Sequence, residues 1–466
     1  MNDNSRQVSF KESLTVFTIL IFSLIVGVAI LKIDLTVVLL ISLFIVISFS
    51  MIKGYSLEYI KSGMANSITR TYDALLIFIL IGANIGIWIL SGTIPSLIYY
   101  GLNILSPNIF LPAGLLICSL TSLATGTSWG TISTVGIALL GIGQSLGIPV
   151  PLIAGMIVSG AFFGDKISPM SDTTNLAAAS TNTNLYDHIG SMLYTTIPSY
   201  LLALIIYTIL GLNYKTSYID YTQVNLIQNT LSNTFNISLF TLIPIIIVIV
   251  LSIMKKPALI SMSIGIIFGI FVAVFFQDAS FKEALTVLNT GYTIPTNVDI
   301  VDKLIIRGGI QSMMSTFSLA FIALSLGGIL DEVGYLKILV EKILLKVEKV
   351  GSLIAITILS CILSNTIMGE AYLSIILNGR LYESKYKSLG LQSRMLSRSL
   401  EEGSTLTTGL IPWTTAGAFI SGTLGVSTLT YAPLAFFNIL NPLISILFSY
   451  LGIFVLKSNK KIKTIG

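Results

Sequence analysis

Long apolar runs alternate with short polar segments along most of the chain. Runs without a charged residue cover positions 14–31, 35–52, 190–212 and 433–456. Each run is long enough to cross the hydrocarbon core of a bilayer, about 30 Å thick, as an α-helix. The pattern therefore predicts an all-α polytopic membrane protein.

The composition agrees with that prediction. Hydrophobic residues make up 54% of the 466 positions and charged residues only 10%, compared with roughly 25% in soluble domains. The net charge of +5 does not indicate nucleic-acid binding, because Lys and Arg gather at the ends of the apolar runs. No small-residue cleavage site follows 14–31, so we expect the first span to be retained rather than removed as a signal peptide.

The sequence gives poor support for a membrane enzyme. The sequence has no HExxH and no P-loop pattern. Its two cysteines, Cys118 and Cys361, have apolar neighbours and form no Cys/His cluster. We expect no cofactor, and only Na⁺ and H⁺ as transported or coupling ions.

An internal repeat organises the chain. A shift of 243 positions aligns residues of the first half with identical residues of the second half. The aligned identical pairs include Cys118 and Cys361, Gly126 and Gly369, Gly160 and Gly403, and Pro169 and Pro412. The repeat predicts two structurally related halves, 1–212 and 235–466, joined by a linker at 213–234.

Charge placement predicts that the halves have inverted topology. Loops 93–108 and 136–151 carry no charge, whereas the repeat-related loops 335–350 and 379–398 hold many Lys and Arg residues, which accumulate on the cytoplasmic side. The segment between the two loops of each half must then begin and end on the same side. We expect re-entrant hairpins there, at about 109–135 and 351–378.

Ten spans follow, five in each half. Both termini are expected to be cytoplasmic, and the short loops suit a bacterial plasma membrane. The predicted spans are 14–31, 35–52, 74–91, 152–180, 190–212, 235–254, 257–276, 310–331, 399–425 and 433–456. The fourth span of each half, 152–180 and 399–425, is interrupted by a proline and is predicted to be a broken helix.

The segment GDKISPMSDTTNLA, 164–177, carries the chemistry that we single out. It follows Ala74 to Gly164, a stretch without any Asp, Glu, Lys or Arg. Broken helices near the bilayer midplane expose helix ends and carbonyls, with which secondary transporters bind ions. Carboxylates and neutral oxygens suit a hard cation, so Asp165 and Asp172 are predicted ligands of Na⁺. The full set of candidate ion- or substrate-binding residues is Asp165, Ser168, Asp172, Thr173, Asn175, Thr127, Ser128, Asn365, Thr366, Glu370, Glu402, Thr414 and Thr415.

Each charged candidate also has a structural alternative. Asp165 could pair with Lys166, and Asp172 could cap the half-helix that begins at Thr173. Glu370 could form a salt bridge with an unidentified cation. The remaining alternatives are an ion-pair cluster of Glu401 and Glu402 with Arg394 and Arg398, and a loop position rather than a proton relay for His188.

The segment GDKISPMSDTTNLAA, with GTSWGT before it and Asp187 and His188 after it, resembles the NhaC-type Na⁺/H⁺ antiporter family of the ion transporter superfamily. The resemblance implies sodium–proton exchange. It places Asp165, Ser168, Asp172 and Thr173 in the family's signature region and Glu370 in its counterpart in the second half. Relatives of this kind also include exchangers of organic anions, such as malate against lactate, and others that carry amino acids.

Three functional hypotheses follow. The first is an antiporter that exchanges Na⁺ for H⁺ by alternating access, in which one carboxylate binds either ion. The second is a Na⁺- or H⁺-coupled carrier of a small organic anion or amino acid, whose carboxylate Thr127, Ser128, Asn365 and Thr366 could bind. The third is a channel or scaffold. The sequence also leaves open whether the chain is a monomer or a homodimer.

Overall fold

The computed structural model describes residues 8–213, 221–254, 256–344 and 347–458. These residues form helices and connecting loops, and the only β-bridge among them joins Leu391 to Lys457. Within these ranges nine helices are long and apolar enough to cross a membrane, or up to eleven if two bent helix pairs are each one span. The predicted fold class, an all-α polytopic membrane protein, is confirmed.

Helices occupy all ten segments for which the apolar pattern predicts spans. They are α1 (Phe10–Leu24), α2 (Leu35–Ile52), α4 (Tyr72–Leu90), α9 (Val150–Ile167) with α10 (Asp172–Ser180), α11 (Leu185–Leu212), α13 (Ile243–Ile253), α14 (Ala258–Phe276), α17 (Met314–Glu332), α21 (Ser393–Leu400) with α22 (Leu406–Thr408) and α23 (Thr415–Leu424), and α25 (Phe436–Leu451).

Helices also lie in segments that the apolar pattern leaves as loops or linker. Five of them are α3 (Leu57–Arg70), α5 (Thr93–Ile104), α12 (Tyr221–Thr234), α15 (Phe281–Thr290) and α16 (Asp299–Ile305). The predicted linker therefore contains a helix, and its positions 214–220 lie outside the described residues. None of the five is long and apolar enough by itself to cross a membrane, which is why a search for apolar runs does not detect them.

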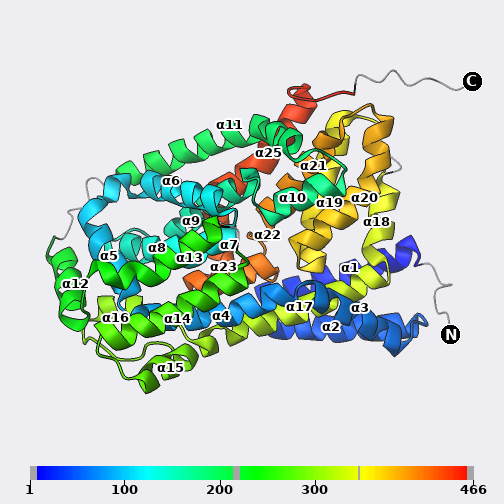
Figure 1. The fold of residues 1–466 in the computed structure, drawn as a ribbon. Coiled ribbons are helices and arrows are strands. Elements are labelled where there is room, and N and C mark those ends of the chain that lie inside the picture. The colour runs from blue at the N-terminus through cyan, green and yellow to red at the C-terminus, as the bar shows by residue number, and fades with distance from the viewer. Residues whose placement is uncertain (1–7, 214–220, 255, 345–346, 459–466) are drawn as a thin grey trace, which may run out of the picture.

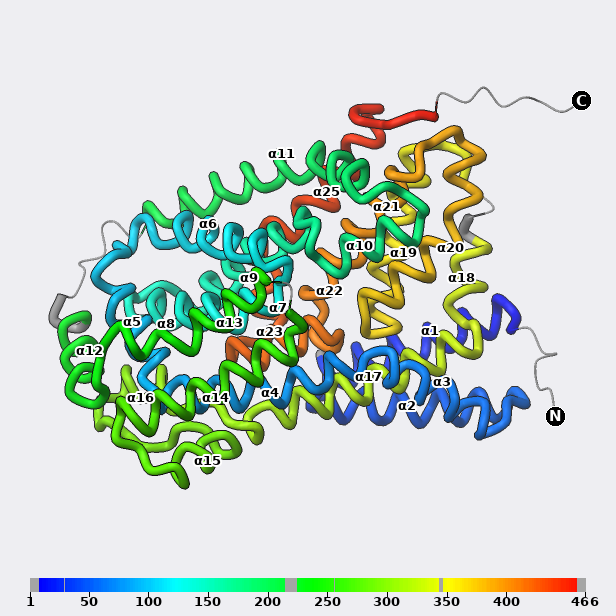
Figure 2. The backbone as a smooth tube through the Cα atoms, in the orientation of Figure 1, coloured from blue at the N-terminus to red at the C-terminus, as the bar shows by residue number. Residues whose placement is uncertain are grey.

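The molecule is elongated, and the uncharged loops of the first half lie toward the opposite end from the lysine-rich loops of the second half (Figure 1). At one end lie α5, α12 and α8 (Ile137–Ser145), next to the uncharged loops of the first half. At the other end lie α18 (Tyr335–Leu344) and α20 (Ala371–Ser388), with the lysine-rich loops. The tube in Figure 2 shows the start of α1 and the C-terminal segment after α25 toward that second end. The last described residues contact it, since the Ser458 N–H donates to the Gly390 carbonyl.

The two segments predicted as hairpins have the same backbone pattern. In the first, α6 (Pro107–Thr125) ends at Gly126, whose φ of 72° is left-handed, and the chain restarts as α7 (Ser128–Thr131). In the second, α19 (Val350–Met368) ends at Gly369, with a φ of 70°, and restarts as α20. Glycine adopts this conformation without the Cβ clash of other residues. By length and composition alone, α6 and α19 could also be full spans.

Pro169 accounts for the end of α9 in the first half of the chain. The residue before a proline is pushed out of the helical region, and Ser168, before Pro169, is extended at φ −74° and ψ 128°. The helix α9 therefore ends at Ile167, and α10 starts at Asp172. In the second half, the corresponding gap between α22 and α23 contains Pro412.

Contacts between these segments recur at the same spacing as the sequence repeat. A Cβ on Gly160 would lie 2.6 Å from the Cys118 Cβ, and a Cβ on Gly403 would lie 2.6 Å from the Cys361 Cβ. The Ser122 hydroxyl donates to the Ala161 carbonyl, and the Asn365 amide donates to the Ser404 carbonyl. Each partner in the second half lies 243 positions after its counterpart in the first.

Candidate functional site

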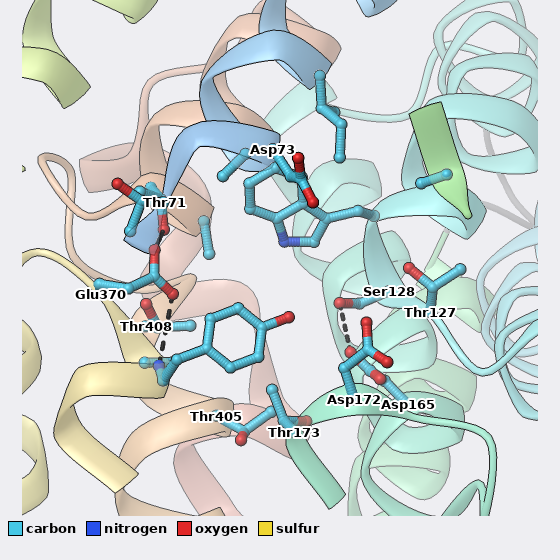
Figure 3. Close-up of a pocket in the computed structure, with 18 of the residues that line it drawn as sticks. Thr71, Asp73, Thr127, Ser128, Asp165, Asp172, Thr173, Glu370, Thr405 and Thr408 are labelled. Carbon is cyan, nitrogen blue, oxygen red and sulfur yellow. Dashed lines mark hydrogen bonds between the residues drawn. The ribbon is translucent and has the colours of Figure 1, made fainter. Parts of the chain in front are cut away.

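A cavity of about 490 Å³ lies where the helix breaks of the two halves meet. The break after α6, the end of α9, the start of α10, the break after α19 and the start of α23 all contribute to its wall. Its polar lining residues are Arg70, Thr71, Asp73, Thr127, Ser128, Asp165, Asp172, Thr173, Glu370, Tyr372, Thr405, Thr408 and Thr415. Figure 3 shows Asp165 and Glu370 on opposite sides of the cavity.

Asp165 stands in the last turn of α9 and is held by two hydroxyl groups. The Ser128 hydroxyl donates to its Oδ2 at 2.6 Å, and the Ser171 hydroxyl donates to its Oδ1 at 2.6 Å. The side chain is buried, and no Lys or Arg nitrogen of the described residues lies within 4.0 Å of it. A carboxylate that is oriented by hydroxyls but has no fixed counter-ion can receive a mobile cation.

Glu370 forms the opposite wall and is the N-cap of α20. Its Oε1 accepts the Tyr372 N–H at 3.4 Å, and its Oε2 accepts the Thr415 hydroxyl at 2.5 Å. The carboxylate is buried and satisfies free N–H groups at the helix start, where negative charge is favoured. The two bonds tie the helix starts of α20 and α23 together at the cavity.

Asp172 and Thr173 line the same cavity from the start of α10. Asp172 is exposed to the cavity in the first turn, and Ser171 rather than Asp172 is the N-cap. The Thr173 hydroxyl donates to Glu401 Oε1 at 3.0 Å. Thr173 therefore connects the cavity to a buried carboxylate behind its wall.

A buried ion pair lies on the side of α9 away from the cavity. Lys166 Nζ is 3.5 Å from Glu402 Oε1, and both side chains are fully buried. Lys166 also donates to Asn441 Oδ1 at 2.5 Å, and the Thr195 hydroxyl donates to Glu402 at 2.5 Å. The adjacent charges of the GDK segment thus point in different directions, Asp165 to the cavity and Lys166 to this ion pair.

Seven of the thirteen predicted site residues line the cavity: Thr127, Ser128, Asp165, Asp172, Thr173, Glu370 and Thr415. The other six, Ser168, Asn175, Asn365, Thr366, Glu402 and Thr414, do not. Ser168 donates to the Leu123 carbonyl, and the exposed Asn175 donates to the carbonyls of Pro169 and Ser171.

Three more of the six, Asn365, Thr366 and Thr414, hold the surrounding helices together. Asn365 donates to Thr407 and to backbone carbonyls of the following broken span. The Thr366 carbonyl accepts the Trp413 indole N–H at 2.6 Å. Thr414 is the N-cap of α23.

Several structural alternatives drawn from the sequence are wrong. Asp165 does not pair with Lys166, because that cation binds Glu402 and Asn441. Among the described residues Glu370 has no cation partner within 4.0 Å, and its partners are hydroxyl and N–H groups.

The expected cluster of Glu401 and Glu402 with two arginines is also not formed in the described part of the chain. Arg394 pairs with Asp187 at 3.6 Å, and the buried Arg398 donates to backbone carbonyls. His188, expected in a loop, lies in the first turn of α11, where its Nδ1 is 2.8 Å from the Ser397 hydroxyl.

The sequence from Gly126 to Gly130, GTSWG, matches the GxSxG pattern of serine hydrolases. In serine hydrolases a histidine base is hydrogen-bonded to the nucleophilic serine. The Ser128 hydroxyl instead donates to Asp165, and His188 is bonded to Ser397. The GTSWG segment instead forms the start of α7 at the cavity.

Six polar lining residues were not among the sequence candidates: Arg70, Thr71, Asp73, Tyr372, Thr405 and Thr408. Arg70 and Asp73 come directly before the long uncharged stretch, so their position beside it was a usable signal. Thr405 and Thr408 follow Glu402 on the same broken span. Only the tertiary packing of the halves brings these segments together.

The lining chemistry favours cations. The described lining residues include four carboxylates, Asp73, Asp165, Asp172 and Glu370, and one guanidinium, Arg70. No group of three or more His, Cys, Asp or Glu residues within the described ranges could hold a resident metal. The arrangement suits a weakly held, exchangeable ion, for which hydroxyl and carboxylate oxygens are the ligands.

A family model described as "Na+/H+ antiporter family" matches residues 160–453. The chain belongs to that family. Over 425 residues it is 39% identical to the malate-2H⁺/Na⁺-lactate antiporter of Bacillus subtilis (strain 168), covering 91% of each chain. It is 38% identical to the Na⁺/H⁺ antiporter NhaC of Alkalihalophilus pseudofirmus, covering 95% of this chain and 97% of the relative. A second NhaC antiporter, from Bacillus subtilis (strain 168), is 33% identical, covering 96% of this chain and 99% of the relative.

Membership of this antiporter family indicates a transporter rather than an enzyme. The matched region contains the end of α9, all of α10, the segment from α21 to α23, the buried ion pair and the Glu370 side of the cavity. The NhaC resemblance inferred from the GDKISPMSDTTNLAA segment is therefore confirmed.

Proposed function

We propose that this protein exchanges Na⁺ for H⁺ across a bacterial plasma membrane by alternating access. The observation that carries the proposal is the buried Asp165 carboxylate, which faces a cavity and is bonded to two hydroxyls but to no cation among the described residues. The excess of carboxylates in the lining supports a cationic substrate. The NhaC relatives support sodium and protons as the two ions.

Competition for one carboxylate is sufficient for exchange. Asp165, with Asp172 beside it at the cavity, binds either Na⁺ or a proton, because a buried charge must be neutralised by one of them. A transporter that changes its access only when Asp165 is neutralised then moves one ion in each direction. The hydroxyls of Ser128 and Ser171 orient the carboxylate in both states.

The proposal includes two inverted repeats whose broken helices meet at the cavity. It is supported by the contacts that recur at a spacing of 243 residues and by the matching left-handed glycines, Gly126 and Gly369. The lysine-rich loops and both ends of the described chain would face the cytoplasm, in accordance with the positive-inside rule. Such an arrangement allows one half to rock against the other around a fixed site.

The test uses purified protein in liposomes that contain no organic solute. A liposome interior that is more acidic than the outside should drive uptake of radioactive sodium as protons leave. A protonophore that collapses this proton gradient should stop the uptake. The Asp165→Asn variant should lose gradient-driven uptake, because an amide cannot exchange a proton for Na⁺. Equal uptake by the wild type and this variant would refute the assignment of Asp165.

A second candidate is a carrier that couples the ions to a small organic solute. The cavity volume of about 490 Å³ exceeds what a sodium ion needs, and one relative is named as a malate-2H⁺/Na⁺-lactate antiporter. Arg70 is the lining group that could bind a carboxylate. Sodium uptake that occurs only after malate or lactate is added would select this second function.

A further inference from the structure

Glu401 is a buried carboxylate close to the cavity but outside its wall. It begins the π-helical turn η6 (Glu401–Thr405), which interrupts the broken span between α21 and α22. The side chain is fully buried. The antiport cycle proposed above, in which Asp165 exchanges its two ions, gives this carboxylate no role.

Hydroxyl groups connect Glu401 to the cavity. Thr173, which lines the cavity, donates to Glu401 Oε1 at 3.0 Å. The Thr173 and Ser171 hydroxyl oxygens are 3.1 Å apart, and Ser171 donates to Asp165 Oδ1 at 2.6 Å. The two carboxylates therefore lie at the ends of a chain of two hydroxyls.

This hydrogen-bonded row of two carboxylates and two hydroxyls lacks one hydrogen when both carboxylates are ionised. It contains three oxygen–oxygen gaps, from Asp165 to Ser171, from Ser171 to Thr173 and from Thr173 to Glu401. Each gap needs one hydrogen, and the two hydroxyls supply only two. With both carboxylates ionised the central gap is therefore empty, whereas one proton on either carboxylate completes the chain.

The charges around Glu401 do not include a paired cation. The nearby Lys166 is bound to Glu402, and no Lys or Arg nitrogen of the described residues lies within 4.0 Å of Glu401. Its second oxygen, Oε2, has no hydrogen-bond partner among those residues. An ionised carboxylate in this position would be poorly compensated.

The elements packed against η6 include α9, α10, α19, α20, α21, α22 and α25. The helices α19, α22 and α25 contain no Asp, Glu, Lys, Arg or His residue. The charged or titratable side chains that face Glu401 or lie next to it are Asp165 and Lys166 from α9, Asp172 from α10, Tyr372 from α20, Arg398 from α21 and the adjacent Glu402.

We propose that Glu401 carries a second proton in each exchange cycle, in addition to the one exchanged at Asp165. A proton from cavity water binds Thr173 Oγ1 while the hydrogen that Thr173 already carries moves to Glu401 Oε1. The hydroxyl ends with one hydrogen, and Glu401 becomes a neutral acid. Release to the other side of the membrane reverses these two transfers. The inference rests on the proposed sodium–proton exchange and raises its ratio to two protons per sodium ion.

The ratio of protons to sodium ions is measured at the point of zero net flux. The membrane potential of the liposomes is clamped at zero and a tenfold sodium gradient is imposed. The pH gradient across the same membrane is then varied until the net sodium flux stops. A ratio of two is balanced by about 0.5 pH unit and a ratio of one by about 1 pH unit, because every tenfold gradient carries the same free energy per ion. The balance point does not depend on how much of the protein is active.

We expect the wild type to give a ratio of two and Glu401→Gln to give one. Thr173→Val, which removes the relay hydroxyl at nearly constant volume, should also give one, and Thr173→Ser should restore two. Glu341→Gln, which changes an exposed glutamate on α18, is the matched control and should give two. If Glu401→Gln is not obtained as folded protein, the comparison of Thr173→Val with Thr173→Ser decides the question.

An unchanged ratio in Glu401→Gln and Thr173→Val, or a ratio of one in the wild type, would overturn the second proton site. Both results leave sodium–proton exchange itself intact. A wild type that shows no exchange under any gradient refutes the proposed function instead. A merely structural role for Glu401 would lower the rate of exchange without moving the balance point.

Discussion

At the scale of single residues, cavity exposure separates candidates that the sequence treats alike. Asp172 is open to the cavity, whereas Asn175, one turn later, donates to the carbonyls of Pro169 and Ser171 before the helix. Removing a negative charge near a bound cation weakens its binding. Asp172→Asn should therefore raise the KM for Na⁺ about five- to tenfold, on the order of 1 kcal/mol. Asn175→Ala should leave the KM unchanged. Sodium-dependent exchange in liposomes measures both, and equal effects of the two substitutions would contradict the assignment.

The buried pair of Lys166 and Glu402 is predicted to stabilise the protein rather than to bind substrate. Lys166→Met leaves Glu402 buried without its cation, which costs about 3–5 kcal/mol. Adding Glu402→Gln removes the unpaired charge and should recover much of that loss. The measurement is thermal unfolding in detergent, with a coupling free energy from the double-mutant cycle. Additive effects of the two substitutions would show that the pair contributes no coupling.

How far the sequence predicts a residue's role depends on whether its partners are local. Asp165 and Asp172 were predicted as a site because a proline and two carboxylates interrupt one apolar span. Glu402 was predicted for the same site, but its partner Lys166 lies in the other half of the chain and holds it away from the cavity. Thr405 and Thr408 carry no charge to mark them, so only the packing of the two halves shows that they line the cavity.

At the scale of elements, the crossing of α6 with α9 and of α19 with the broken span of the second half depends on glycine. A Cβ on Gly160 or Gly403 would approach the facing cysteine Cβ to 2.6 Å and force the helices apart. Gly160→Ala and Gly403→Ala should each destabilise the protein by about 1–3 kcal/mol. Gly190 on α11 has open space around it, so Gly190→Ala is the matched control.

Thermal unfolding of these three variants in detergent gives the comparison. Gly190→Ala should keep or slightly raise the midpoint, since alanine favours a helix more than glycine does. A loss of stability in Gly190→Ala as large as that in Gly160→Ala would mean that the glycines matter for backbone flexibility and not for close packing.

Elements were predicted well where apolarity or proline determines them. Helices occupy the ten predicted segments, and α9 ends immediately before the Ser168–Pro169 pair. The amphipathic or polar helices α3, α15 and α16 were missed because they are too short or too polar to cross a membrane. Their formation depends on packing against the spans, which an apolar run does not report.

At the scale of the whole molecule, the proposed orientation can be tested by chemical labelling. In a background with Cys118 and Cys361 replaced by alanine, Asn103→Cys tests the uncharged end, and Ser62→Cys and Ser388→Cys test the lysine-rich end. These three positions are exposed. A membrane-impermeant maleimide should label Asn103→Cys in intact cells and the other two only in everted vesicles. Labelling of all three from the same side would contradict the inverted arrangement.

The cavity around Asp165 is proposed to exchange sodium for protons without an organic partner. The most direct measurement records the internal pH of liposomes containing the wild-type protein while Na⁺ is added outside, with no organic solute present. We predict an immediate alkalinisation inside, which saturates with Na⁺ and is absent in Asp165→Asn. A wild-type protein that gives no pH change until malate or lactate is supplied would contradict exchange without an organic partner and would make the same cavity the site of a solute carrier.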